Sequence, residues 1–223
     1  MRLILLIINT GILVILGVLA QDNLKAKLED FVPPAHAPHG TIEVVFSPNS
    51  NACATIIKAI SQAKKSILVS AYSFTSKDIA QALLDAKKRH VSVKIILDKS
   101  QVSQRYSSGT FFANQKFDLH IDIKHAIFHN KVMIIDDITV ITGSYNFTKA
   151  AETKNAENLL IIRDNPQLAK LYTENWRFHW NQSISWQEFL QKKARDKNIT
   201  SSSSSKTNMI RRQEIKDEIR LDM

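Results

Sequence analysis

The sequence predicts an α/β layered fold in which parallel strands pair at the centre of the sheet. The main observation is the order of elements between residues 42 and 97, where apolar, β-branched runs alternate with segments of helical periodicity. A strand–helix–strand–helix–strand order is typical of parallel pairing beneath covering helices. The second observation is composition, because 44% of the 223 residues are hydrophobic and glycine and proline number five each. The chain can therefore fill a core and is neither collagen-like nor broadly disordered.

Periodicity assigns the elements in the first part of this region. Ile56, Ile57 and Ile60 share one face of a helical segment. Ser76 followed by Asp78 is a typical helix start. Apolar runs without the helical period indicate buried strands. We expect strands at residues 42–46, 66–72 and 91–97, and helices at residues 52–64 and 76–89.

The later elements follow from the same patterns. Asp136 and Asp137 form a turn between two apolar runs. Pro166 suits the first turn of an amphipathic helix. We expect helices around residues 106–114, at 147–153 and at 166–180, and strands at 119–123, 131–135, 139–142 and 159–162.

The first 20 residues indicate a secretory signal peptide. Arg2 precedes a long apolar run, and Val18 and Ala20 occupy the −3 and −1 positions of a cleavage site after Ala20. An uncleaved N-terminal membrane anchor is the alternative, because the run is at the lower limit of length for a membrane span. In either case we expect the rest of the chain to lie outside the cytoplasmic membrane.

Composition divides the rest of the chain into three segments. Residues 21–40 contain three prolines and are predicted to be a linker. Residues 41–186 carry all the predicted strands and are expected to form one folded domain. Residues 187–223 include a run of five serines and are predicted to be a flexible polar tail with room for a short final helix.

Cys53 is the one cysteine in the sequence, so no intrachain disulfide can form. It lies in the apolar helical segment, with no nearby residue that would act as its base. We therefore expect a buried, inert thiol rather than a reactive one.

The chain is strongly basic, with a net charge of +9 and a pI of about 9.6. A basic surface attracts partners that carry phosphate, such as nucleic acid or anionic lipid headgroups. The charge is spread over the middle of the chain and the tail, and simple solubility charge is an alternative explanation. The charge thus indicates a bias toward such partners and does not identify a substrate.

The polar residues between positions 129 and 158 follow a pattern that places several of them on common faces. His129 and Lys131 differ by two positions, so their side chains point to the same side of a strand. Asp136 lies seven positions after His129 and faces the other side, so we assign it a structural role in fixing the turn or pairing across the sheet. Ser144 and Asn146 also share a face if the chain is extended there.

These residue types meet the demands of phosphodiester cleavage, which needs a neutralised phosphate, a nucleophile and a proton donor for the leaving alkoxide. The neutral imidazole of His129 can attack phosphorus without activation by a metal. Lys131 supplies a point charge, and Ser144 and Asn146 offer hydrogen bonds to phosphate oxygens. The other ring nitrogen of His129 needs an acceptor, and we place Glu157 there.

The motifs resemble those of a known family. The spacing His129-x-Lys131-x4-Asp136, followed by Gly-Ser-x-Asn at residues 143–146, is similar to the signature of the phospholipase D superfamily. Further segments resemble its short, single-motif subgroup of small bacterial endonucleases and short secreted phospholipases D of intracellular bacteria. These segments are Ala-Tyr-Ser-Phe-Thr at 71–75, residues 146–155, and Trp-x3-Trp-Asn at 176–181. The resemblance covers about residues 40–185.

The resemblance implies an α/β/α sandwich around a mixed β-sheet and no cofactor. Because this chain has one motif where other members have two, it also implies a homodimer in which each chain supplies one His129 to a shared active site. One His129 would form a phosphohistidine, while the other would protonate the leaving alcohol and then activate water. Lys131, Ser144 and Asn146 match the family's phosphate-binding positions, and Glu157 matches the acid that supports the histidine.

No metal site is predicted. His125 lies four residues before His129, a spacing that would suit two metal ligands on a helix. Ile127 and Phe128 lie between them, and the pair is not assigned a third, acidic ligand.

The resemblance leaves the substrate open. The leading interpretation is a secreted phosphodiesterase that hydrolyses phospholipid headgroups, converting a phosphatidylcholine-type substrate to phosphatidate at a membrane surface. The alternative is a nonspecific, metal-independent endonuclease that acts on DNA or RNA. An inactive phosphate-binding module is less favoured, because all five site positions carry chemically competent residues.

Overall fold

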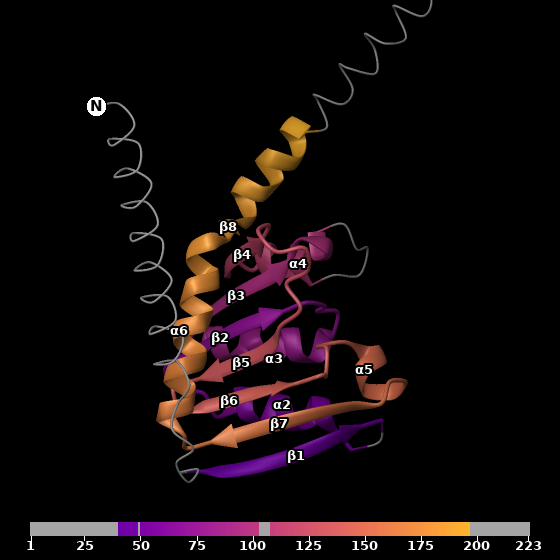
Figure 1. Cartoon of the computed structure of the whole chain (residues 1–223), viewed down its shortest axis with the longest axis vertical. Helices are drawn as coiled ribbons and strands as arrows, with labels where there is room; N and C mark the ends of the chain where they lie inside the picture. The colour runs from indigo at the N-terminus through magenta and orange to yellow at the C-terminus, as the bar shows by residue number, and fades with distance from the viewer. Residues whose placement is uncertain (1–39, 49, 103–107, 197–223) are drawn as a thin grey trace, which may run out of the picture. The chain divides into compact units, whose positions relative to one another are not determined.

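The computed structural model has a mixed β-sheet of eight strands in the order β1-β7-β6-β5-β2-β3-β4-β8 (Figure 1). The strands are β1 (Thr41–Ser47), β2 (Ser66–Ala71), β3 (Ser92–Asp98), β4 (Asp118–Asp122), β5 (Lys131–Ile135), β6 (Thr139–Gly143), β7 (Glu157–Arg163) and β8 (Ile184–Ser185). The predicted α/β class is therefore confirmed.

The structure describes residues 40–48, 50–102 and 108–196, which belong to the compact unit formed by residues 39–223. The predicted signal peptide lies outside the described residues, as do nearly all of the predicted linker and the serine run of the tail. Within the described ranges, no helix combines the length and the apolarity needed to cross a bilayer.

Parallel pairing occupies the centre of the sheet. Strand β3 pairs in parallel with both β2 and β4. The other pairs (β1 with β7, β7 with β6, β6 with β5, β5 with β2, and β4 with β8) are antiparallel. This pattern fits the strand–helix–strand order of the first part of the chain, because a helical crossover returns the chain in the same direction and a short turn reverses it.

Side chains cap the first turns of the helices that begin at Lys77 and Pro166. The Ser76 hydroxyl accepts a hydrogen bond from the Ile79 N–H at 3.3 Å, and the Asn165 side chain accepts one from the Leu168 N–H at 3.0 Å, just before Pro166. Such caps satisfy backbone donors that the helix leaves free. The helices are α2 (Ala52–Ser61), α3 (Lys77–Lys88), α4 (Gly109–Asn114), α5 (Lys149–Thr153) and α6 (Pro166–Gln182), with a 3-10 turn at Lys99–Val102.

Two apolar cores lie on the two faces of the sheet and make the predicted sandwich. The larger core joins α2 and α3 to one face through residues such as Ile56, Leu83 and Met133. The smaller core joins α6 to the other face through Ile134 and Trp176. Trp176 also donates its indole N–H to the Val69 carbonyl at 3.0 Å, which fixes α6 against β2. The predicted burial of the helical periodic faces is thus confirmed.

Several element boundaries differ from the expected ones, and two of these differences have a clear cause in packing. Helix α5 begins at Lys149 rather than near Phe147, because Phe147 is fully buried and pairs with Phe74 in an isolated parallel bridge. At the other end, a helix at residues 186–196 continues the fold beyond residue 186 into the segment expected to be tail. Trp186 and Phe189 of this helix pack against the larger core, which explains why the segment is ordered.

The strand directions gather the functional residues at one end of the sheet. Strands β1, β2, β3, β4 and β6 end there, while β5 and β7 begin there (Figure 1). In open α/β sheets, ligands bind beyond the carboxyl ends of the parallel strands. This end of the sheet is therefore where the chemistry is expected, and we refer to it as the site end.

Candidate active site

Four strand ends meet at the site end, and each has one residue of interest at or beside it. His129 lies two residues before β5, and Tyr72 directly follows β2. Ser144 directly follows β6, and Glu157 is the first residue of β7. Since β7, β6, β5 and β2 are consecutive strands in the sheet, these residues come from neighbouring strand ends.

Tyr72 joins His129 and Lys131 into one cluster. The rings of Tyr72 and His129 have centroids 4.7 Å apart, and the Lys131 ammonium lies 5.1 Å from the Tyr72 ring centroid. The Lys131 ammonium also donates to the His129 carbonyl oxygen at 2.8 Å, and the Tyr72 N–H donates to the Asn130 carbonyl at 2.8 Å. The His129 side chain is exposed, so a substrate can reach it. His129 and Lys131, which were predicted to share a face, thus both lie next to the Tyr72 ring.

Lys131 is a buried cation next to this exposed histidine. Only 7% of its surface is exposed. Burial lowers the pKa of the Lys131 ammonium, while the negative charge of Glu157 acts in the opposite direction. A partly desolvated cation binds a phosphate oxygen more strongly than a hydrated one, because less water competes for it.

Glu157 is engaged by Ser144 and Asn155. The Ser144 hydroxyl donates to Glu157 Oε2 at 2.5 Å, and the Asn155 side-chain amide donates to Glu157 Oε1 at 3.0 Å. Both carboxylate oxygens therefore have partners other than His129, and no bond from Glu157 to His129 is seen within the described residues. Glu157 was expected to accept a hydrogen bond from the His129 ring, and in this chain its hydrogen bonds join Ser144 and Asn155.

Gly143 and Asn158 shape the backbone around Ser144. Gly143 has a φ of 148°, and a Cβ there would lie 2.3 Å from the Asn158 carbonyl oxygen. The same carbonyl accepts the Ser144 N–H at 3.1 Å, and the Asn158 N–H donates to the Ser144 hydroxyl at 3.1 Å. The glycine of the Gly-Ser-x-Asn motif is required because two backbone segments touch there.

Asn146 lies two residues beyond Ser144, with the buried Tyr145 between them. This alternation agrees with the expected extended chain. The Asn146 side-chain oxygen is buried and has no hydrogen-bond partner among the residues that the structure describes. A buried polar atom without a partner is uncommon in a folded protein and indicates an unmet interaction.

Asp136 lies at the end of β5 opposite to His129, which puts it at the far end of the sheet. Its carboxylate accepts the backbone N–H groups of Lys64, Lys65 and Ser66 at 2.8, 2.7 and 2.9 Å. Burial raises the pKa of Asp136, but these hydrogen bonds lower it by more, so the net shift is downward. The contacts tie the turn after β5 to the start of β2, which is the kind of structural role expected for this aspartate.

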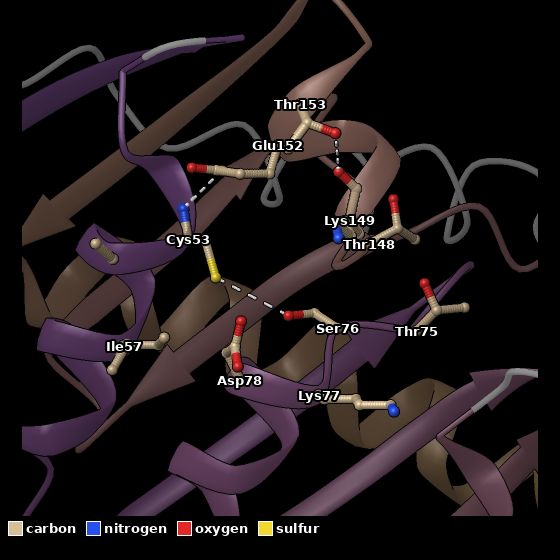
Figure 2. Close-up of a pocket in the computed structure, with 11 residues that line it drawn as sticks. Cys53, Ile57, Thr75, Ser76, Lys77, Asp78, Thr148, Lys149, Glu152 and Thr153 are labelled. Atoms are coloured by element: carbon tan, nitrogen blue, oxygen red, sulfur yellow. Dashed lines mark hydrogen bonds between the residues drawn. The ribbon is translucent and has the colours of Figure 1, made fainter.

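A cavity of about 640 Å³ lies between the first turns of α2, α3 and α5 (Figure 2). Cys53 lines it, and burial, together with Glu152 and Asp78, raises the pKa of its thiol despite the opposing effect of the Ser76 hydroxyl. Glu152 is used structurally, since it accepts from the Cys53 N–H at 2.9 Å and the Tyr145 hydroxyl at 2.8 Å. The high thiol pKa fits the expectation of an inert cysteine.

Sequence reasoning did not select Tyr72 as a site residue. It follows a buried strand, and the Ala-Tyr-Ser-Phe-Thr segment at 71–75 indicated the family without giving Tyr72 a role. Its place beside His129 depends on the pairing of Ala71 with Lys131 across β2 and β5. This pairing joins residues 60 positions apart, so it cannot be predicted from the sequence near either residue.

Comparison with known proteins places these features in a family. A family model described as "Cardiolipin synthase, PLD-like domain" matches residues 56–180. A phospholipase D of Rickettsia typhi is 42% identical over 135 residues, which are 60% of this chain and 66% of that protein. This match spans just under two thirds of the relative's length.

Solved structures agree with this assignment. The crystal structure of a phospholipase D family member, Nuc from Salmonella typhimurium, is 44% identical and has a TM-score of 0.64. That alignment covers 66% of this chain and 99% of Nuc. NucT from Helicobacter pylori is 25% identical with a TM-score of 0.58, over 66% of this chain and all of NucT.

Proposed function

This chain belongs to the phospholipase D superfamily, and from this premise we propose that it is a phosphodiesterase that hydrolyses phospholipid headgroups outside the cytoplasmic membrane. The observation that carries the proposal is the exposed His129 beside the buried Lys131 cation at the site end of the sheet. The preference for a lipid is supported by similarity to several rickettsial proteins named phospholipase D, at 40–42% identity.

In the proposed reaction, His129 attacks the phosphorus of the headgroup diester. A phosphorus–nitrogen bond forms, the bond to the headgroup oxygen breaks, and the leaving alcohol takes a proton from a second acid. Water then attacks the phosphorus, the nitrogen leaves, and phosphatidate is released. Lys131, Ser144 and Asn146 would hold the phosphate oxygens, because a cation and two hydrogen-bonding side chains offset the charge of the transition state.

The second acid is proposed to be His129 of another copy of the chain. No ring contact between His129 and another histidine is seen in residues 40–48, 50–102 and 108–196, so one chain offers one exposed imidazole at this site. A symmetric pair of chains would bring two such rings to one phosphate. The homodimer is thus a part of the proposed mechanism, with no cofactor.

An apolar edge next to the site favours a lipid surface. Strand β1 is an edge strand, and its side chains Ile42, Val44 and Phe46 are 53%, 50% and 60% exposed. Phe46 pairs in register with Asn158, one residue from Glu157. Exposed apolar side chains gathered along one strand are typical of a surface that contacts apolar material.

Nonspecific cleavage of DNA or RNA is the second candidate. The net charge of +9 would attract any polyphosphate backbone as readily as anionic lipid. Residues 1–20 support export in either case, with a membrane anchor as the alternative. Sequencing the N-terminus of the exported protein tests this, and we expect Gln21 as its first residue.

A paired assay decides between the substrates. Purified protein would be incubated with phosphatidylcholine vesicles in one arm and plasmid DNA in the other, both with EDTA. We expect release of choline and no cleavage of DNA, and His129→Ala serves as the inactive control. Cleavage of DNA alone would replace the lipid proposal with the endonuclease, and loss of the activity to EDTA would contradict the metal-independent mechanism.

A further inference from the structure

A buried carboxylate and two histidines form a cluster away from the His129 ring. Asp122 is the last residue of β4 and is fully buried, His125 lies in the loop between β4 and β5, and His179 lies near the end of α6. One ligand atom from each of these residues lies within 4.8 Å of the others. The end of β4 with its following loop, and the distant helix α6, thus bring metal-ligating atoms close together.

The contacts within this cluster are incomplete. Asp122 Oδ2 lies 3.0 Å from His125 Nδ1, and Asp122 Oδ1 accepts the His125 N–H at 3.0 Å. The rings of His125 and His179 have centroids 5.1 Å apart in an edge-to-face arrangement. His179 Nδ1 is buried and has no hydrogen-bond partner among the described residues. An unpaired buried nitrogen beside a buried carboxylate costs free energy, which a cation between them would recover.

We propose that Asp122, His125 and His179 bind one divalent ion of the zinc class at a site separate from His129. Two imidazoles and one carboxylate are a typical protein donor set for Zn²⁺, with a fourth position left for water. Ligand atoms around tetrahedral zinc lie roughly 3.3 Å apart, given bonds of about 2.0–2.1 Å. The Asp122 and His125 atoms are 3.0 Å apart, close to this spacing, and all three ligand atoms lie within 4.8 Å of one another, so metal binding requires only a small adjustment of the side chains.

The site would stabilise the loop that carries His129. This loop is already held by the Phe128 N–H, which donates to Asp98 Oδ2 at 2.8 Å, and by the Lys99 ammonium, which donates to the His125 carbonyl at 2.8 Å. A metal bound to His125 and His179 would add a bond from the loop to α6. The sequence analysis found no acidic ligand for His125 because it considered a helix from His125 to His129, whereas this segment is not helical.

The test measures metal binding directly. The full-length protein, stripped with EDTA and dialysed, would be titrated with Zn²⁺ by calorimetry and with Co²⁺ by visible absorption, and its melting temperature would be measured with and without Zn²⁺. We expect one equivalent of Zn²⁺, the d–d bands of bound Co²⁺ and a higher melting temperature with zinc. Asp122→Asn and His179→Gln should weaken binding at least roughly tenfold.

Two matched histidine variants serve as controls. His90→Asn changes an exposed histidine that adopts a positive φ, which asparagine tolerates, and His129→Asn removes the site-end imidazole. Both should keep full Zn²⁺ affinity. The proposal is overturned if the wild type binds no stoichiometric Zn²⁺, if Asp122→Asn and His179→Gln bind as tightly as the wild type, or if His129→Asn abolishes binding.

Folding and activity are separated by two further measurements. If Asp122→Asn or His179→Gln does not fold, the Zn²⁺ affinity of His125→Gln tests the site instead and should be weakened in the same way. The fold should tolerate this change, because 41% of the His125 side chain is exposed. EDTA should lower the melting temperature and leave turnover at 25 °C intact, since the cluster does not contact His129. A chain that binds Zn²⁺ but cleaves no diester would retain this site and lose the proposed function, so the two proposals fail independently.

Discussion

Ser144 shows how one hydroxyl can serve both the fold and the site. It donates to Glu157 and accepts from the Asn158 N–H. Ser144→Ala removes one hydrogen bond near the proposed phosphate position, so we expect kcat/KM to fall about 10–100-fold on the substrate that the chain hydrolyses. The free energy of unfolding should fall by only about 1 kcal/mol.

Steady-state kinetics and urea denaturation measure these two effects. Ser92→Ala, at an exposed position at the start of β3, is the matched control and should change neither. A Ser144→Ala variant with wild-type kcat/KM would show that this hydroxyl does not contact the reacting phosphate.

Asp136 should stabilise the fold in a pH-dependent way. Its pKa in the folded protein lies below the ordinary value, so its contribution is fully present above about pH 4 and is lost as the pH falls through the lower folded-state pKa. Asp136→Asn keeps a residue that tolerates the φ of 55° but removes the charge that three N–H groups bind. We expect a loss of about 2 kcal/mol at pH 7.

Urea denaturation of both proteins between pH 2 and 7 checks this prediction. The difference between wild type and Asp136→Asn should shrink below about pH 4. Asp118→Asn, at an exposed position in β4, should show no such difference. A difference that stays constant down to pH 2 would contradict the assigned origin of the effect.

At the residue scale, the sequence predicted what strand alternation can predict. The separation of Asp136 from His129 follows from counting along the chain, whereas His129 itself precedes β5 and lies near Lys131 because both residues are next to Tyr72. The partners of Glu157 did not follow, because Ser144 and Asn155 reach it through the pairing of β6 with β7 and a local turn. Contacts set by register between strands cannot be read from one segment of sequence.

At the scale of elements, Gly143 at the end of β6 allows the close backbone approach to Asn158 that positions Ser144. A Cβ at this position would meet the Asn158 carbonyl at 2.3 Å, with φ at 148°. Gly143→Ala should therefore cost about 2–4 kcal/mol of unfolding free energy and should also lower activity, because Ser144 and Asn158 must move apart.

Urea denaturation and kinetics again provide the test. Thr110→Ala, an exposed substitution in α4, is the control and should leave both properties unchanged. A fully stable and active Gly143→Ala variant would mean that the close approach of the two backbones is not needed.

Strands and helices with strong periodicity were predicted well, and elements defined by tertiary contacts were not. The helix predicted at 166–180 is present as α6 and extends to Gln182. The helix at 186–196 was not separated from the tail, since its apolar residues Trp186 and Phe189 are few and the serine run dominates the composition of that segment. Packing against the larger core, rather than local propensity, accounts for this helix.

At the scale of the whole molecule, β1 bears on the choice of substrate. If its apolar side chains contact a bilayer, Phe46→Ser should weaken binding to phosphatidylcholine vesicles about tenfold, since burying a phenylalanine contributes about 1.5–3 kcal/mol. Hydrolysis of a small, water-soluble phosphodiester should be unaffected, because Phe46 carries no chemistry.

Vesicle co-sedimentation and a chromogenic diester assay measure the two properties separately. Ile138→Ser is the control, because Ile138 is 40% exposed and lies in the turn between β5 and β6, at the opposite end of the sheet from His129. Equal vesicle binding by Phe46→Ser and wild type would remove the structural support for a lipid surface and favour the endonuclease.

The proposed mechanism requires His129 to carry phosphorus during turnover. The most direct measurement mixes the protein with whichever diester it hydrolyses, quenches the reaction within one turnover under alkaline conditions and maps adducts by peptide mass spectrometry. The account predicts a phosphoryl adduct on the peptide that contains His129, and neither adduct nor turnover in His129→Ala. Turnover by His129→Ala, or an adduct only on another residue, would contradict it.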